Sequence, residues 1–235
     1  RSFSVSVAAA AADTDIYANW AVVGAAVETG GKLDSYQPTQ NPSDNFYEIE
    51  TPEALAWFAY QVNVRSKANI NARLMNDIDL SAYANWTPIG TFTRNPLQAS
   101  YPFSGVFDGQ GYSITGLKMS GNEDSKGLFG YAYCEAIRNV VIRNPEIEGK
   151  DQVGALVGYQ AYSNQGIKNC AVIGGKIQGR NHVGGLVGYM EESPIQNCYS
   201  TCEVVAMNFY AGGIVGDHRV VASIRNCYAT GNISG

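Results

Sequence analysis

Short hydrophobic runs of four to six residues, each bounded by glycine or asparagine, fill the second half of the chain. Runs of this length that end in bend-forming residues predict short β-strands. One run recurs in four copies, at 127–130 (GLFG), 154–158 (GALVG), 184–188 (GGLVG) and 212–216 (GGIVG). A repeat with a period of about 30 residues predicts a solenoid, because no single unit buries its apolar face alone.

Each copy is followed by an Ile-x-Asn phrase and then by a third hydrophobic arm. The asparagines are Asn139, Asn169, Asn197 and Asn226, which are 30, 28 and 29 residues apart. The third arms end near Ile147, Ile177, Val204 and Ile233. Three arms and three corners predict one rung of a right-handed parallel β-helix, with about three short strands per rung. Glycines interrupt every window long enough for an amphipathic helix, so a helical-repeat solenoid is excluded and the fold class is all-β.

Equivalent positions lie above one another if the rungs stack about 4.8 Å apart. Two sets of aliphatic residues are then predicted to form inward ladders: Leu128, Leu156, Leu186 and Ile214, and Ile137, Ile167, Ile195 and Ile224. The four asparagines predict a third ladder at a corner, because Asn tolerates a left-handed backbone and its amide bonds to the Asn above and below. The predicted role of this ladder is structural.

Three cysteines, Cys170, Cys198 and Cys227, directly follow these asparagines, where the first repeat has Val140. The exchange of Val for Cys indicates a position that favours a small buried hydrophobe. Side chains one rung apart lie slightly beyond disulfide geometry, so we expect free thiols with a structural role.

A single α-helix is predicted near residues 52–63, within the sequence TPEALAWFAYQVN. Thr51 is a favoured N-cap, Pro52 suits the first helical position, and the apolar residues then follow helical spacing. Because a solenoid must cover the apolar end of its core, we assign this helix as an N-terminal cap.

Three regions follow from these patterns. Residues 1–45 are an N-terminal segment in which 19–27 matches 169–177 at four positions, a possible degenerate rung followed by a linker. Residues 46–126 hold the helix cap and the first irregular rungs. Residues 127–235 hold the four regular repeats, continuous with the preceding region. The sequence stops directly after a complete rung, so we expect a fragment or a following segment that covers the end.

Composition narrows the function classes. The net charge is −5 and no basic run occurs, which argues against nucleic acid as a partner. No uninterrupted apolar stretch reaches the roughly 18 residues that span a bilayer. The five cysteines form no CxxC pair and the two histidines lack zinc spacing, so no metal site and no cofactor are predicted.

The phrases GGLVG and GGIVG resemble the motif of the bacterial GLUG-motif repeat proteins. Upstream, NDIDL, the W-x-P-I-G string and FSGVFDGQGYSITGL resemble the region that leads into such repeats. The resemblance implies a secreted or surface-attached, adhesin-like protein, and hence an extracellular or cell-surface location. Related repeats precede the catalytic region of some immunoglobulin A metalloproteases, but no HExxH motif occurs in this sequence.

Catalysis on a β-helix would need carboxylates projecting from neighbouring rungs. The candidates are Asp77 and Asp79, which alternate along one predicted strand, and Asp108, in the turn sequence FDGQG. Hydrogen bonding at turns and corners is the simpler account of all three. They remain the carboxylates of an alternative function, a carbohydrate-active lyase or glycosidase.

Tyrosines and unequal loops are the stronger functional candidates. Tyr131, Tyr159 and Tyr189 follow the first arm, and Tyr199 and Tyr228 follow the ladder cysteines. An outward row of tyrosines offers a platform for a sugar ring or an apolar protein surface, although a self-supporting tyrosine stack is the alternative. The copies differ most in the loops at 131–136, 159–166, 189–194 and 217–223. The sequence therefore predicts a non-enzymatic binding or adhesion module. Its expected partner is either a glycan or a protein of a host or neighbouring cell. A passive stalk is a further alternative.

Overall fold

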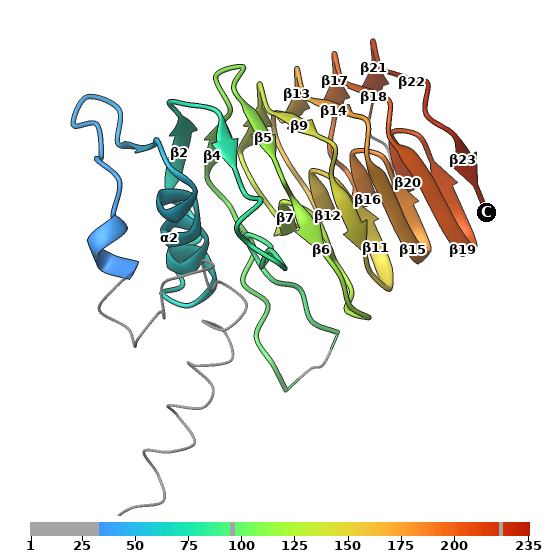
Figure 1. Ribbon diagram of the computed structural model, residues 1–235, viewed down its shortest axis with the longest axis horizontal. Helices are drawn as coiled ribbons and strands as arrows, with labels where there is room; N and C mark the ends of the chain where they lie inside the picture. Colours follow the sequence, from blue (N-terminus) through green and yellow to red (C-terminus); the bar gives the residue numbers. More distant parts are fainter. Residues whose placement is uncertain (1–32, 95–96, 221–222) are drawn as a thin grey trace, which may run out of the picture.

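The chain winds into a parallel β-solenoid in the computed structural model, which describes residues 33–94, 97–220 and 223–235 (Figure 1). The predicted all-β parallel β-helix with one helix is confirmed. The proposed degenerate rung at 19–27 lies outside the described residues. Nearly every strand pairs in parallel with the equivalent strand of the next rung, so the sheets run along the length of the molecule.

Each regular rung has four strand positions, where the sequence predicted about three. In the first regular rung these are β7 (Phe129–Ala132), β8 (Ala136–Arg138), β9 (Val141–Arg143) and β10 (Glu146–Glu148). The correction has a local cause. Asn139 adopts a φ of 56°, and this left-handed corner divides the second predicted arm into two strands that belong to different sheets.

Four sheets result from stacking these positions. The first sheet contains β1 (Phe46–Ile49), β2 (Asn71–Leu74), β4 (Val106–Asp108), β8, β13 (Gly166–Lys168), β17 (Ile195–Gln196) and β21 (Ile224–Arg225). The second contains β3 (Ile78–Asp79), β5 (Ser113–Thr115), β9, β14 (Ala171–Ile173), β18 (Tyr199–Ser200) and β22 (Tyr228–Ala229). The third contains β6 (Lys118–Met119), β10, β15 (Lys176–Gly184), β19 (Glu203–Gly212) and β23 (Ile233–Ser234), with β11 (Asp151–Gly154) beside β15. The fourth contains β7, β12 (Val157–Gln160), β16 (Val187–Glu191) and β20 (Val215–Arg219).

The predicted aliphatic ladders form the core. Ile137, Ile167, Ile195 and Ile224 are register partners from rung to rung. Leu128, Leu156, Leu186 and Ile214 are likewise connected by backbone hydrogen bonds between neighbouring rungs. The first three members of each ladder are fully buried. Burying one such side chain contributes on the order of 1.5 to 3 kcal/mol, so the ladders are a major source of stability.

The asparagine ladder is confirmed in full. Each amide nitrogen donates to the amide oxygen of the preceding Asn, with distances of 3.0, 3.1 and 3.1 Å. All four residues have φ between 53° and 56°. Asn139, at the start of the row, donates to the carboxylate of Asp108 at 2.9 Å. The Asn side chains therefore connect successive rungs at the corner between the first and second sheets.

The ladder cysteines are free thiols, as predicted. Cys170 and Cys198 are buried, and the backbone N–H of Cys170 lies 3.3 Å from the sulfur of Cys198. Burial raises the pKa of the Cys170 thiol well above its ordinary value. These side chains act as small hydrophobic residues with weak hydrogen bonds, which suits their position beneath the asparagine corner.

The glycines of the repeated phrase have a different role from the one the sequence suggested. Their φ values are not left-handed, so they do not serve as conformational corners. They allow backbones to touch: a Cβ on Gly188 would lie 2.3 Å from the nitrogen of Val153 and 2.4 Å from the carbonyl carbon of Gln152. Gly158 packs in the same way against Ser125 and Lys126 of the preceding rung. The fourth sheet thus lies directly on the backbone of the segment before it.

The helix α2 (Pro52–Asn63) covers the N-terminal end of the core, as predicted (Figure 1). Its N-cap is Thr51, whose hydroxyl accepts a 3.2 Å hydrogen bond from the N–H of Ala54. Phe58 packs against Phe103 and Phe107 with ring centroids 5.8 and 6.0 Å apart. The short 3-10 helix η1 (Leu33–Tyr36) lies beside α2. Nine consecutive residues of α2, 54–62, are buried, so the helix is enclosed rather than amphipathic at the surface.

Gly188→Ala should strongly destabilise the protein. The added Cβ meets backbone atoms, which no rotamer change moves away, so we expect a loss of about 3 kcal/mol or more in the free energy of unfolding. The matched control is Gly111→Ala, where nothing lies within 4 Å of the added Cβ and φ is +84°. That variant should lose only about 1 to 2 kcal/mol, the cost of a left-handed backbone. Urea unfolding of both variants measures the difference, and equal losses would disprove the close-approach role.

Asn169→Ala and Asn169→Gly should separate the two contributions of the asparagine corner. Both variants lose the ladder hydrogen bonds, each contributing about 0.5 to 1.5 kcal/mol, but only Ala also has to adopt the left-handed φ. We expect both to unfold at lower urea than the wild type, and Ala at lower urea than Gly. A glycine variant as stable as the wild type would show that the amide ladder contributes nothing.

Candidate functional site

A cleft of about 380 Å³ lies among the loops that join the fourth sheet to the first. Its walls are Ser104, Tyr133, Glu135, Tyr162, Asn164 and Glu192, and its floor is Cys134 and Ser163. These loops were predicted to be the recognition elements, because the repeats differ most there. The structure places parts of three successive loops around one cavity, which makes this cavity a candidate site.

Loop length explains the shape of the cleft. Three residues, 133–135, connect β7 to β8, whereas five residues, 161–165, connect β12 to β13. Ser163 anchors the longer loop: its hydroxyl donates to the carbonyl of Glu135 at 3.2 Å and accepts from the N–H of Gly166 at 2.8 Å. The anchored loop carries Tyr162 outward, beside Tyr133 of the preceding rung.

Tyr133 and Tyr162 form an exposed aromatic pair on the cleft. Their side chains are 49% and 45% exposed, and their ring centroids lie 5.8 Å apart with an interplanar angle of 49°. Most tyrosines of the solenoid pack more closely against the protein. Two open ring faces that meet at an angle offer a platform to the C–H face of a sugar ring or to another flat or cationic group.

Glu135 supplies a fixed carboxylate next to this pair. Its two oxygens accept hydrogen bonds from Gln165 at 3.0 Å and from Asn164 at 3.3 Å. These hydrogen bonds hold the pKa of Glu135 below its ordinary value, so the group is ionised at neutral pH. Glu192 is a second, exposed carboxylate of the lining.

The thiol on the cleft floor is not a nucleophile. Cys134 is only 3% exposed and contacts the amide of Gln160 at 3.8 to 3.9 Å. Burial raises the pKa of Cys134 to about 12, which leaves almost no thiolate at neutral pH. The chemistry that the cleft offers is therefore hydrogen bonding, charge and aromatic contact.

Three of the predicted tyrosines form a packed aromatic row. Tyr131 and Tyr159 stack at 5.0 Å, and Tyr159 meets Tyr189 edge-on at 5.2 Å. Phe92, from the loop before β4, packs against both Tyr131 and Tyr159 at 5.4 and 4.9 Å. These contacts cover ring surface that was predicted to be available to a ligand.

Two of the three hydroxyl groups are also occupied. Tyr159 and Tyr189 donate to the two carboxylate oxygens of Glu191, at 2.9 and 2.8 Å. Burial, reinforced by this carboxylate, raises the pKa of Tyr189 to about 12, so the hydroxyl remains a donor. The row is half-buried, its rings pack on one another, and Tyr159 and Tyr189 bond to the adjacent Glu191. This is the geometry of a self-supporting stack.

The remaining two predicted tyrosines lie on the second sheet. Tyr199 and Tyr228 are register partners whose rings stack in parallel, 5.2 Å apart at 4°. Tyr228 is 57% exposed. The loop cleft does not include this pair, which offers a flat aromatic surface instead.

The three candidate carboxylates hold local hydrogen bonds at two places in the fold: Asp77 and Asp79 lie just before and within β3 of the second sheet, and Asp108 ends β4 of the first. Asp77 accepts from the backbone and hydroxyl of Ser113 at 2.7 and 3.0 Å. Asp79, at the end of β3, accepts from the N–H of Ser81 at 2.9 Å. These bonds hold the pKa values of both carboxyl groups below the ordinary range.

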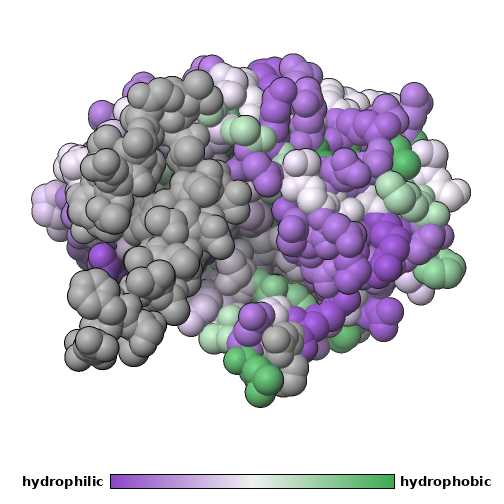
Figure 2. Space-filling view, turned by 60° about the horizontal axis from the view of Figure 1, so that its bottom comes forward, coloured by the Kyte–Doolittle hydropathy of each residue, from purple (hydrophilic) through white to green (hydrophobic). Residues whose placement is uncertain are grey.

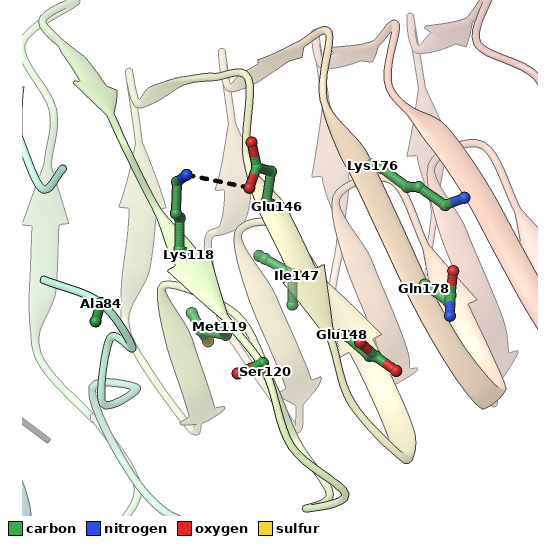
Figure 3. A pocket seen from close by; sticks show the side chains of 9 residues that line it. All are labelled: Ala84, Lys118, Met119, Ser120, Glu146, Ile147, Glu148, Lys176 and Gln178. Carbon is green, nitrogen blue, oxygen red and sulfur yellow. Dashed lines mark ion pairs between the residues drawn. The ribbon is translucent and has the colours of Figure 1, made fainter.

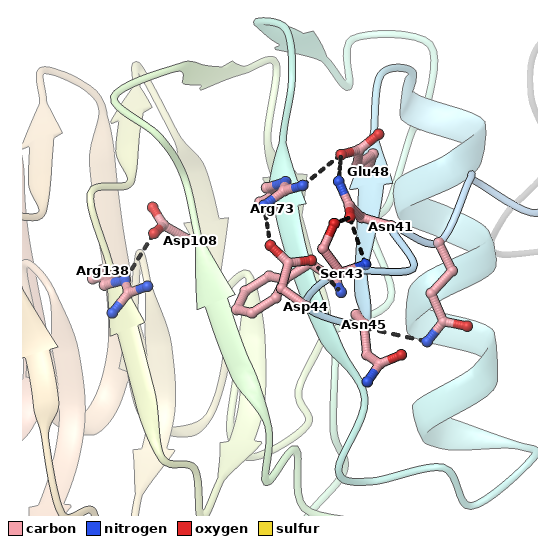
Figure 4. Close-up of polar contacts among 10 residues, drawn as sticks. Asn41, Ser43, Asp44, Asn45, Glu48, Arg73, Asp108 and Arg138 are labelled. Atoms are coloured by element: carbon pink, nitrogen blue, oxygen red, sulfur yellow. Dashed lines mark hydrogen bonds and ion pairs between the residues drawn. The ribbon is translucent and has the colours of Figure 1, made fainter.

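Asp108 is the most constrained of the three (Figure 4). It is buried and accepts from the guanidinium of Arg138 at 2.7 Å, from the amide of Asn139 at 2.9 Å and from the N–H of Gln110 at 2.9 Å. Burial alone would raise its pKa, but these three donors outweigh it and hold the pKa low. Figure 4 also shows Arg73 between Asp44 and Glu48, which connects the first strands of the same sheet.

A second groove, of about 330 Å³, lies on the third sheet (Figure 3). Three of its charged residues, Lys118, Glu146 and Lys176, alternate in register from rung to rung, and Glu203 continues this row beyond the groove. Lys118 pairs with Glu146 at 3.2 Å and Lys176 with Glu203 at 3.0 Å. Paired cross-strand charges of this kind stabilise a solvated sheet face, and they leave few unpaired groups for a ligand.

The face in Figure 2 is mainly hydrophilic, with hydrophobic residues in separate patches. No group of His, Cys, Asp or Glu in the described ranges has a metal-binding arrangement. The helices of the described part include none that is long and apolar enough to cross a bilayer.

Comparison with known proteins agrees with the repeat pattern. The family described as "The GLUG motif" matches residues 207–234. The chain carries GLUG repeats. That match covers the last regular repeat, and the register of the ladders extends the same unit back through the three preceding repeats.

Two proteins resemble this GLUG-repeat chain. Halomucin of Haloquadratum walsbyi is 36% identical over 101 aligned residues, covering 39% of this chain and 1% of that protein. A crystal structure from Bacteroides ovatus, provisionally named an immunoglobulin A1 protease, has a TM-score of 0.68 and 25% identity. The alignment covers 83% of this chain and 60% of that one. The structural similarity supports the solenoid fold, and this chain spans only part of either relative.

The sequence pattern singled out the loops that line the cleft but not the two tyrosines that open onto it. Tyr133 and Tyr162 do not occupy equivalent positions in their loops, so the repeat alignment did not pair them. The available signal was the unequal loop length, three residues against five. A longer loop beside a shorter one displaces its side chains toward the neighbouring rung.

Asp108→Asn should reveal a structural rather than a catalytic carboxylate. The folded-state pKa of Asp108 lies below its unfolded-state pKa of 3.8. The charge of Asp108 therefore contributes stability at pH values above 3.8, and this contribution is lost as the pH falls through the lower folded-state pKa. The variant should be less stable than the wild type near neutral pH, and the difference should shrink in acid. Urea unfolding across pH measures it, with the exposed Glu148→Gln as control. A difference that persists unchanged at the lowest pH would contradict this role.

Proposed function

We propose that this chain is a non-enzymatic, surface-exposed binding module that recognises carbohydrate in the loop cleft. The observation that carries the proposal is the exposed pair Tyr133 and Tyr162 above a lining of hydroxyl, amide and carboxylate groups. Sugars present an apolar C–H face and many hydroxyl groups, and this combination of aromatic and polar groups complements both. The GLUG repeat and the similarity to a protein named halomucin support a surface-associated repeat protein.

The scaffold supports a binding role. Stacked rungs hold the loops on rigid strands, so the cleft is largely preformed and little entropy is lost when a ligand binds. The aromatic row of the fourth sheet, which includes Tyr131 and Tyr159, lies directly before these loops in the chain and stiffens their base. Recognition on variable loops of a regular scaffold is a common arrangement in solenoid proteins.

A carbohydrate-active enzyme is the second candidate. The provisional name of the Bacteroides ovatus protein, a protease, is the reason to consider a hydrolytic function. A glycosidase needs one carboxyl with a raised pKa to donate a proton. The described carboxyl groups with a shifted pKa are all lowered: Asp44, Glu48, Asp77, Asp79, Asp108, Glu123, Glu135 and Asp151. This distribution favours binding over acid catalysis.

Tyr162→Ala should weaken glycan binding about tenfold, a loss of about 1.4 kcal/mol, because it removes one of the two ring faces. Tyr133→Ala should act similarly, and Tyr162→Phe should retain the stacking. The matched control is Tyr228→Ala, which removes an exposed tyrosine that lies on the second sheet, away from the cleft lining. A glycan array identifies ligands, and calorimetric titration measures the affinities.

Three outcomes separate the candidate functions. A silent array, or cleft variants that bind as the wild type does, would reject recognition in this cleft. Release of reducing or unsaturated sugars from a polysaccharide panel, abolished by Asp108→Ala in a variant that urea unfolding shows to be folded, would support the enzyme. Undiminished ligand binding by a parent protein that lacks this region would support a passive stalk.

A further inference from the structure

We infer that the cleft selects carbohydrates that carry a free ammonium group, that is, amino sugars whose nitrogen is not acylated. This inference rests on the proposed glycan binding and adds the charge class of the ligand. It follows from three features of the cleft: the sign of its charges, the way its carboxylate is held, and the geometry of its rings.

The charged groups that line the cleft have one sign. Glu135 and Glu192 are acidic, and none of the other lining residues is Lys, Arg or His. This differs from the groove of the third sheet, where Lys118 and Lys176 alternate with glutamates. A cavity lined by one sign of charge concentrates ligands of the opposite sign. Uronic acids and sulfated sugars are therefore disfavoured, and a cationic sugar is favoured.

Glu135 is prepared to accept such a cation. The amides of Gln165 and Asn164 each donate one hydrogen bond to it, which fixes its orientation. An ionised carboxylate has about four acceptor positions, so positions remain for an ammonium group. Among the described ion pairs Glu135 has no Lys or Arg partner, in contrast to the exposed Glu146 and Glu203. Its negative charge is thus hydrogen-bonded but not neutralised.

The aromatic pair suits the same group. The faces of tyrosine rings attract cations that lie within about 6 Å of the ring centroid. The centroids of Tyr133 and Tyr162 are 5.8 Å apart and the rings are tilted by 49°, so one ammonium group beside the pair can lie within this range of both centroids. The rest of the sugar then meets the hydroxyl and amide groups of the lining. An N-acetyl group would remove the charge and place a methyl group beside the carboxylates.

The test compares two oligosaccharides of equal length that differ only in acylation: a glucosamine tetramer and an N-acetylglucosamine tetramer. At about pH 5.5 the free amines are protonated. We expect the glucosamine tetramer to bind at least about tenfold more tightly in calorimetric titration. This advantage should fall when salt is raised from about 50 mM to about 500 mM, because screening weakens the charge interaction. It should also fall at about pH 9, where the amines lose their protons.

Isosteric variants locate the effect. Glu192→Gln and Glu135→Gln should each reduce the preference for the glucosamine tetramer, while Glu203→Gln, an exposed carboxylate of the third sheet, should leave it unchanged. Urea unfolding checks that the variants are folded. If Glu135→Gln is unstable because Asn164 and Gln165 lose their partner, Glu192→Gln still locates the effect in the cleft.

The possible failures are distinguishable. If both tetramers bind equally well and the Gln variants change nothing, the charge preference is overturned but carbohydrate binding stands. Binding of neither tetramer nor any array glycan, together with unchanged behaviour of Tyr162→Ala, overturns the proposed function itself. If oligolysine competes as well as the glucosamine tetramer, the cleft is a general cation site and the assignment to sugars is overturned.

Discussion

Backbone contact at the repeated glycines is the constraint on which the rest of this solenoid depends. The fourth sheet lies so close to the preceding segment that a single methyl group on Gly188 would overlap two backbone atoms. Such contact leaves no room for side chains between these layers, so every rung must follow nearly the same path. The aliphatic ladders, the asparagine corner and the cysteines beneath it can align only because this path repeats.

The same regularity explains why the candidate site lies where it does. Strand positions are confined by neighbours above and below, whereas the loops between the fourth and first sheets have open space beside them. Chain length varies there at little energetic cost, since each doubling of a flexible loop costs only about 0.6 kcal/mol. The two extra residues before β13 therefore create a cleft without disturbing the ladders, and Ser163 anchors them to the rung below.

Much of the architecture was predictable from the sequence because it depends on repetition. Ile137 and Ile167 identify a ladder as soon as the copies are aligned, and the asparagines identify a corner by their side-chain chemistry. The helix over 52–63 followed from Thr51 and Pro52. The strand count did not, because the alignment does not show that Asn139 turns sharply enough to separate two sheets.

The site was less predictable for the same physical reason. Tyr159 was predicted as a binding residue because it recurs in successive rungs. The same recurrence places a tyrosine directly above and below it, and its ring packs against both. Tyr162 does not repeat, and it is the residue that opens onto the cleft. The role of the glycines was also hidden, since a sequence does not distinguish a glycine needed for a left-handed backbone from one needed for close approach.

The asparagine row has a direction as well as a register. Every side-chain amide donates toward the N-terminal end of the solenoid, so the four amide dipoles point the same way. Aligned dipoles add, and hydrogen bonds in such a chain polarise one another. The positive end of the row meets the ionised carboxylate of Asp108, in the same way that an anion is stabilised at the N-terminus of an α-helix. This β-solenoid thus has, along one corner, an electrostatic axis of the kind usually associated with helices.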